Sequence, residues 1–189
     1  LMSYNVYVLG NGKSRETVDL NKLDGIVIGC NAIHREYTPD ILCCADERMV
    51  VEAKANNFPN DIYTRSKWHA GHGVKAFPDL PYEGDKKFDD PWHWNTGPHA
   101  INLACTLDPM HTTIHLYGFD FVQNKLYENM YAGTKNYDYK TIDPTHWYYQ
   151  LGMLYKSHRD LDFVWHAPKH FTCPQEWFDH SNFSHSIIL

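Results

Sequence analysis

The ten residues NVYVLGNGKS, at positions 5–14, decide the fold class of this chain. Their first half is a short apolar run with β-branched and aromatic side chains, which predicts a β-strand over residues 5–9. The second half is rich in Gly and Asn, which are typical turn residues. A short helix is expected to follow toward Leu20. A strand that ends in a turn and leads into a helix is the repeating unit of α/β proteins.

Strands and helices alternate in the same way along the rest of the chain. Continuous apolar runs at residues 25–29 and 41–45 predict strands that are buried on both faces, as in a parallel sheet. Later strands are expected at residues 112–117 and 162–165. Helical patterns follow the capping residue Asp46, begin at the sequence NTGP of residues 95–98, and cover residues 145–158. Together they predict an open, mostly parallel, Rossmann-like α/β sheet with helices on both faces.

Three segments are expected to contain little regular structure. Residues 58–94 crowd Pro, Gly, Asp and aromatic side chains together, with one short strand at the sequence IYTRS. Residues 122–142 are rich in Tyr, Asn and Lys. Both loop-rich segments are expected to lie over the functional site, and residues 168–189 are expected to wrap the surface. Because the 189 residues contain no repeat or low-complexity linker, we predict a single domain, residues 1–189.

Composition narrows the classes of partner and compartment. Lys and Arg number 17 against 23 Asp and Glu, and the formal charge of −6 argues against duplex nucleic acid or an anionic membrane as a partner. No apolar run approaches the length of a membrane span, and the first residues lack the layout of a signal peptide. The five cysteines are an odd number, and several lie in apolar runs typical of reduced core residues. We therefore expect a cytoplasmic protein.

Polar side chains gather where the predicted parallel strands end. They are Asn11 and Ser14 after the first strand, Asn31 after the second, Asp46 after the third, and Asp120 after a later one, with Thr96 at a helix start. Ligands bind at this edge of open α/β sheets, and helix N-termini there face anionic groups. The alternative interpretation is that these residues are ordinary turn formers.

The familiar phosphate and metal motifs do not fit. GNGKS is not a P-loop, because that motif needs a Gly at position 7, where this chain has Tyr. It is not the dinucleotide fingerprint G-x-G-x-x-G either, because position 15 is Arg and not Gly. The His69 and His72 pair has no second pair to complete a zinc site. The acidic motif at residues 160–162 leads into a strand far along the chain from the other candidates. We therefore predict that both features are structural.

His146 is a candidate base. It stands at the start of a predicted helix, where the helix dipole keeps an imidazole neutral and able to accept a proton near pH 7. The alternative is a histidine that packs among neighbouring aromatic side chains.

The sequence resembles a known family of enzymes in three places. These are VLGNGKS at residues 8–14, GCN at residues 29–31, and NTGPHAINLACTLDPMHTTIHLYGFDFVQN at residues 95–124. They are similar to the bacterial sialyltransferases of glycosyltransferase family 42, in which corresponding turns surround a cytidine nucleotide sugar. With these motifs, the resemblance extends over about 100 of the 189 residues. It implies a CMP-sugar donor and a hydroxyl acceptor.

The resemblance also implies roles for individual residues. The donor nucleotide and sugar would be bound by Gly10, Asn11, Gly12, Ser14, Asn31, Asp46, Thr96, Gly97, Gly118 and Asp120. Tyr127 or Tyr131 would hydrogen-bond the leaving phosphate, and His146 would be the general base. No metal ion or other cofactor is implied.

Two other functions stay open at this point. The first is an ATP- and magnesium-dependent pyrophosphokinase of the same superfamily, in which Asp46 and Asp120 would hold the metal ion. The second is a non-catalytic nucleotide-binding protein. The sequence also leaves open the acceptor, the oligomeric state including a homo-oligomer, and the role of the aromatic residues between Trp68 and Trp94, which suit a sugar-binding surface, a dimer surface or a cover for the sheet.

Overall fold

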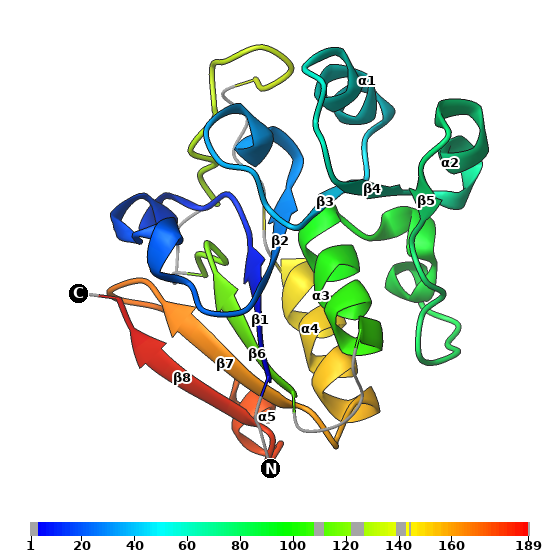
Figure 1. Ribbon diagram of the computed structural model, residues 1–189. Coiled ribbons are helices and arrows are strands. Elements are labelled where there is room, and N and C mark those ends of the chain that lie inside the picture. The colour runs from blue at the N-terminus through cyan, green and yellow to red at the C-terminus, as the bar shows by residue number, and fades with distance from the viewer. Residues whose placement is uncertain (1–3, 108–111, 122–126, 139–142, 144, 189) are drawn as a thin grey trace.

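The computed structural model describes residues 4–107, 112–121, 127–138, 143 and 145–188. In this part of the chain eight strands form one open sheet in the order β5-β4-β3-β2-β1-β6-β7-β8, and all neighbouring strands are parallel (Figure 1). The predicted α/β sheet is confirmed. The strands are β1 Tyr4–Leu9, β2 Ile26–Cys30, β3 Ile41–Cys44, β4 Asp61–Thr64, β5 Lys75–Ala76, β6 Thr112–Tyr117, β7 Asp162–Ala167 and β8 Phe183–Ile187.

The order of the strands reverses at β1. From β1 the chain builds outward through β2 to β5 on one side, and it later returns to place β6, β7 and β8 on the other side. After β1 and after β6 the chain therefore starts from the same edge of the sheet and continues toward opposite sides of it. Such a switch point is where open α/β sheets form a crevice for ligands.

Helices cover the sheet on both faces. The α-helices are α1 Glu47–Ala55, α2 Ser66–His72, α3 Thr96–Leu107, α4 Thr145–Ser157 and α5 Gln175–Phe178, and the short 3-10 helices are η1 Lys13–Thr17, η2 Leu20–Lys22, η3 Asn31–Arg35, η4 Lys87–Asp89 and η5 Pro91–His93. Alternate residues of β1 point to opposite faces. Val6 and Val8 join the core formed with α3 and α4, whereas Leu9 joins the core formed with α1 and η3.

Several predicted elements differ from the observed ones. The expected helix after the first strand is the pair of 3-10 helices η1 and η2, and the second strand lies one residue later than predicted. Residues 58–94 contain α2 and β5 as well as the expected short strand. Helix α2 buries none of its residues, so the apolar periodicity that reveals a helix is missing there.

The C-terminal segment is also more regular than predicted. β7 extends to Ala167 and is not the last strand, because α5 and the edge strand β8 follow it. In β8 only Phe183 is buried, and the following residues Ser184–Ile187 are exposed. A strand with one buried residue gives little of the apolar pattern from which strands are predicted.

Candidate functional site

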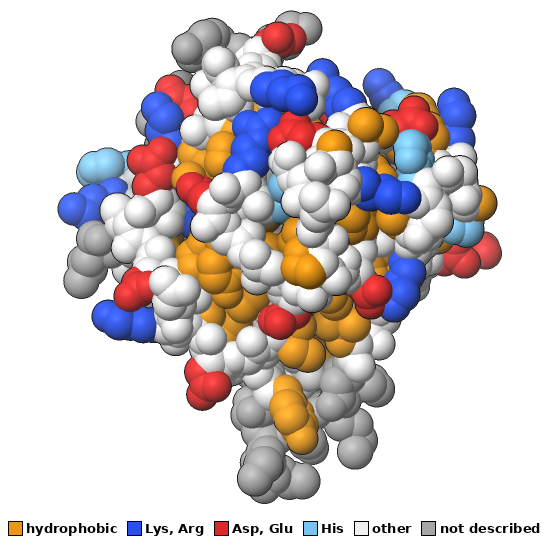
Figure 2. Space-filling model, turned by 45° about the horizontal axis from the view of Figure 1, so that its top comes forward, with side chains coloured by type: hydrophobic (Ala, Val, Ile, Leu, Met, Phe, Trp, Pro, Cys, Tyr) orange, Lys and Arg blue, Asp and Glu red, His pale blue; other side chains and the backbone are white. Residues whose placement is uncertain are grey.

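A cavity of about 600 Å³ opens at the carboxyl edge of the sheet. Figure 2 shows this edge, with hydrophobic side chains in a hollow near the centre and charged side chains around it. The cavity lies between the ends of β1, β2 and β3, the first turn of α3 and the segment 127–138. Seven of the predicted site residues line it, namely Gly10, Asn11, Asn31, Asp46, Thr96, Gly97 and Tyr127.

The loops that follow β1 and β6 are joined by backbone hydrogen bonds. The amide of Gly10 donates to the carbonyl of Tyr117 at 2.8 Å, and the amide of Gly12 donates to the carbonyl of Gly118 at 2.9 Å. Gly118 has a φ of +75°, and a Cβ atom there would lie 2.4 Å from the Gly10 carbonyl oxygen. These glycines let two backbones approach closely at the switch point.

Thr96 ties together three elements that line the cavity. Its hydroxyl accepts a hydrogen bond from the backbone amide of Ala45 at 3.1 Å and donates to the side-chain oxygen of Asn31 at 3.2 Å. Asn31 lies directly after β2 with a φ of +52°, and Ala45 follows β3. The start of α3 is thereby fixed against the ends of two strands, and its first residues line the cavity. The first amides of a helix have no acceptor within the helix and suit an anion.

Asn11 connects β1 with β2. Its amide nitrogen donates to the carbonyl of Cys30 at 2.9 Å, and its side-chain oxygen faces a guanidinium nitrogen of Arg15 at 3.4 Å. The Arg15 side chain is buried and also donates to the carbonyl of Gly10 at 2.8 Å. Arg15 thus holds the turn after β1 through contacts with Gly10 and Asn11.

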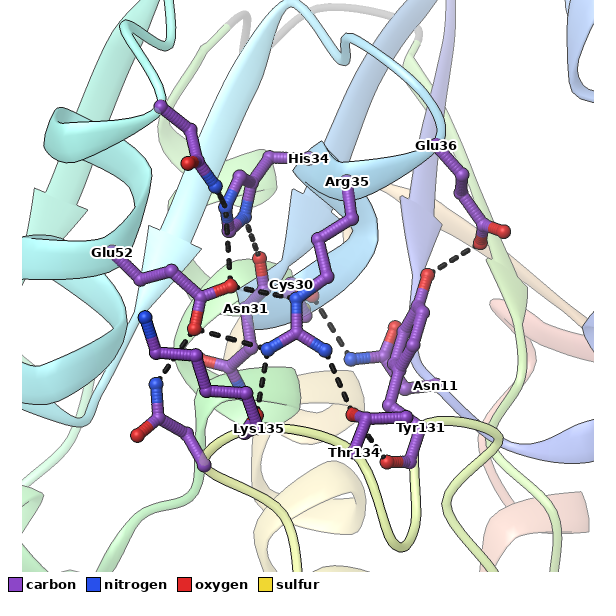
Figure 3. A network of polar contacts seen from close by, with 12 residues as sticks. Asn11, Cys30, Asn31, His34, Arg35, Glu36, Glu52, Tyr131, Thr134 and Lys135 are labelled. Atoms are coloured by element: carbon purple, nitrogen blue, oxygen red, sulfur yellow. Dashed lines mark hydrogen bonds and ion pairs between the residues drawn. The ribbon is translucent and has the colours of Figure 1, made fainter.

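The segment 127–138 forms the opposite wall, and charged side chains hold it (Figure 3). Arg35 of η3 makes a two-pronged ion pair with Glu52 of α1, with distances of 2.6 and 3.0 Å. The same guanidinium donates to the hydroxyl of Thr134 at 2.8 Å and to the carbonyl of Lys135 at 2.6 Å. Glu52 also accepts from the amide of Asn136 at 2.6 Å. These contacts therefore hold in place the next two residues, Tyr137 and Asp138, which line the cavity.

The two candidate tyrosines have different positions. Tyr127 is buried, lines the cavity and donates its hydroxyl to the carbonyl of Gly118 at 3.3 Å. Burial raises the pKa of Tyr127 well above its ordinary value, so it remains a hydrogen-bond donor. Tyr131 is not among the described residues that line the cavity. Its hydroxyl donates to Glu36 and accepts from Arg15, which is a structural role in the wall.

His146 lies just behind the described lining of the cavity. Its Nε2 atom accepts a hydrogen bond from the side-chain amide of Asn95 at 3.1 Å, and Asn95 does line the cavity. The His146 ring stacks on Phe88 with a centroid distance of 5.2 Å. Burial lowers the pKa of His146, so the ring is neutral near pH 7 and Nε2 carries a lone pair. The side-chain amide of Asn95 thus lies between His146, the candidate base, and the cavity.

Four further predicted residues, Gly12, Ser14, Gly118 and Asp120, lie outside the described lining of the cavity. Ser14 donates both its amide, at 2.9 Å, and its hydroxyl to the carboxylate of Asp120. This contact fixes the loop after β1 to the loop after β6. Asp46 lines the cavity from the N-cap position of α1, where its side chain makes no capping bond and lies 3.8 Å from Arg48.

The metal motifs stay outside the described residues that line the cavity. No cluster of three or more His, Cys, Asp or Glu side chains suited to a metal ion is found in the described ranges. The acidic motif at residues 160–162 precedes and begins β7, at the amino end of the strand. This places it at the opposite edge of the sheet from the cavity. None of the helices in the described ranges is long and apolar enough to cross a membrane.

Several residues that line the cavity were not predicted from the sequence. They are chiefly Arg48, Arg65, Asn95, Asn129, Asn136, Asp138, Asp143 and Trp147. Asn95 had a detectable signal, since it precedes a predicted helix start. Arg65 was expected inside the short strand IYTRS but lies just after β4, and Asn129 and Asn136 belong to a segment with no periodic pattern.

Comparison with known proteins gives one structural similarity. No family model matches the chain, and no curated protein matches it in sequence. The fold is similar to that of the monofunctional alpha-2,3-sialyltransferase Cst-I from Campylobacter jejuni, with a TM-score of 0.58 and 15% sequence identity. The match covers 96% of this chain and 83% of the other. At this identity the similarity establishes a shared fold.

Proposed function

We propose that this protein is a small glycosyltransferase of the sialyltransferase-like type, which transfers a sugar from a CMP-linked donor to an acceptor hydroxyl. The observation that carries the proposal is the cavity at the switch point, lined by Asn11, Asn31 and Thr96 from three different parts of the chain. Amide and hydroxyl side chains beside a helix N-terminus suit a phosphate and sugar hydroxyls. The shared fold with a sialyltransferase supports the same conclusion.

The nucleotide phosphate is assigned to the start of α3. Gly97 is the second residue of this helix and lines the cavity. A Cβ atom at Gly97 would lie 2.7 Å from the ring of Phe119, so a side chain there would move the wall. Of the two candidate tyrosines, Tyr127 lines the cavity. It would exchange the carbonyl of Gly118 for a phosphate oxygen as charge develops on the departing CMP.

His146 is assigned as the general base. In the transfer step the acceptor oxygen forms a bond to the anomeric carbon, the bond from that carbon to the phosphate oxygen breaks, and the acceptor proton passes to His146 Nε2. Because Nε2 accepts a hydrogen bond from Asn95 in this structure, the acceptor hydroxyl must replace that amide. The step as written uses no metal ion.

Ligand-dependent stability tests the nucleotide assignment. We expect CMP to raise the melting temperature without magnesium, because a ligand at 100 times its Kd adds about 2.7 kcal/mol, or roughly 5–10 °C for a chain of this size. CDP, UDP, GDP and ATP, each with and without magnesium, are the comparison set. A shift with ATP and magnesium alone would replace the transferase with the kinase-like function, and no shift with any nucleotide would contradict nucleotide binding.

The base assignment has its own test. His146→Ala is expected to keep the CMP-induced shift and to lower sugar transfer by a factor of 100 or more, in the range typical of a lost general base. His69→Ala, on the exposed helix α2, is the matched control and should leave both quantities unchanged. If His146→Ala abolished folding or left transfer intact, the residue would be a packing histidine.

A further inference from the structure

Trp92 stands out among the large hydrophobic side chains. It lies in η5, three residues before the cavity residue Asn95, and 49% of its surface is exposed. Trp94, only two residues later, is completely buried and donates its indole N–H to the carbonyl of Phe88 at 2.8 Å. Trp94 therefore covers the core, whereas Trp92 contributes little to it.

The exposed indole is nevertheless held in place. Arg65 donates to the carbonyls of Pro91, Trp92 and Trp94 at 2.9, 2.8 and 2.7 Å. Its guanidinium also lies over the Trp92 ring, 4.9 Å from the centroid. The amide of Trp92 donates to the side chain of Asp90 at 2.9 Å. A ring with a fixed backbone loses little conformational entropy when a ligand binds.

The surface around Trp92 is continuous with the cavity. Arg65 contacts Trp92 and also lines the cavity, where it donates to the carbonyl of Ala45 at 2.9 Å. The ring of Trp68 lies 5.7 Å from Trp92, and the ammonium of Lys67 lies 5.4 Å from its centroid. The result is an aromatic surface with cationic hydrogen-bond donors, joined to the cavity through Arg65.

We propose that Trp92, with Trp68 and Lys67, forms the subsite that binds a pyranose ring of the acceptor. The C–H face of a sugar ring packs on an aromatic face, and Lys67 can donate hydrogen bonds to the ring hydroxyls. This inference rests on the proposed function, because the acceptor must reach the sugar held in the cavity. A protein partner fits less well, because a stable interface needs about 800 Å² on each side, far more than two indole rings supply.

The test is sugar binding measured by saturation-transfer NMR. The probes are lactose, maltose, cellobiose and chitobiose at millimolar concentrations. We expect at least one of them to receive saturation at its ring protons. Trp92→Ala should reduce this signal at least tenfold, and Trp92→Phe should restore most of it. Phe178→Ala is the matched control, since Phe178 is 46% exposed on α5 and lies outside the described lining of the cavity.

The CMP-induced shift in melting temperature is measured on the same variants and should not change. Equal sugar binding by the wild type and Trp92→Ala would overturn the proposal, and so would the absence of binding to all four sugars. If CMP failed to bind while sugar binding still depended on Trp92, the transferase function would be wrong and the sugar subsite would stand. The two failures are therefore distinguishable.

Discussion

The two walls of the cavity are held together by different interactions. One wall consists of the strand ends, with Asn11, Asn31 and Thr96, and it is fixed by strand register, close backbone contacts and hydrogen bonds, some of them to Arg15 and Asp120. The other wall is the segment 127–138, where Arg35 and Glu52 make most of the charged contacts and a backbone hydrogen bond joins Met130 to Asn11. The strand-end wall is therefore part of the fold itself, whereas the segment 127–138 depends on a few charged side chains.

The largest effect is expected from breaking the ion pair of the second wall. Glu52 is buried, so Arg35→Ala leaves its carboxylate without its main partner and should cost about 3 kcal/mol of unfolding free energy. Urea unfolding measures this loss. The exposed pair of Lys75 and Asp61 is the control, and Lys75→Ala should have no measurable effect. If Arg35→Ala lowered the unfolding free energy as little as Lys75→Ala, the positions of Thr134 and Asn136 would not depend on the ion pair.

The strand-end wall is expected to respond to backbone crowding. Gly118→Ala would place a Cβ atom 2.4 Å from the Gly10 carbonyl oxygen and force a non-glycine residue to a φ of +75°. We expect a loss of about 2 kcal/mol in urea unfolding, together with weaker CMP binding. Gly71→Ala is the control. A Cβ there meets no atom within 4 Å, and the helix should become slightly more stable.

This contrast also explains how much the sequence predicts. Asn11, Asn31 and Asp46 directly follow apolar runs, so strand periodicity places them at one edge of the sheet, and they line the cavity. Arg35 is 99 residues from Thr134, and no local sequence pattern predicts that contact. Tyr131, one of the two tyrosines proposed for the phosphate, pairs with Glu36 and Arg15, which are likewise far from it in the sequence. Side-chain partners across long separations depend on the folded structure.

Acid should affect the core around α3 and the segment 127–138 in different pH ranges. Burial, and then the charge of Arg65, lowers the pKa of His99 in α3 to about 3. Below pH 6.5 the unfolded chain binds a proton that folded His99 does not, so stability falls as the pH drops toward 3. The loss is about 2 kcal/mol at pH 5. The hydrogen bond with Arg35 lowers the pKa of Glu52, so its contribution is lost only below about pH 4.5.

Urea unfolding at pH 7, 6 and 5 separates these contributions. His99→Phe keeps the stacking on Phe77 and removes the titrating group, so the variant should lose less stability between pH 7 and pH 5 than the wild type. The difference in how the unfolding free energy of the two proteins depends on pH gives the contribution of His99 alone. It excludes the contribution of His166, whose burial lowers its pKa to about 4. Identical slopes would mean that His99 is protonated in the folded protein.

The smallest effect concerns the hydroxyl that joins α3 to the strand ends. Thr96→Val has nearly the same shape but leaves the amide of Ala45 and the side-chain oxygen of Asn31 without this partner. We expect a loss of about 1–2 kcal/mol, because buried polar groups lose a hydrogen bond, and Thr96→Ser should recover most of it. Thr106→Val is the matched control in the same helix, since its hydroxyl bonds only locally to the carbonyl of Leu103. If Thr96→Val weakened CMP binding without loss of stability, the hydroxyl would act on the ligand and not on the wall, and the first wall would be less rigid than its hydrogen bonds indicate.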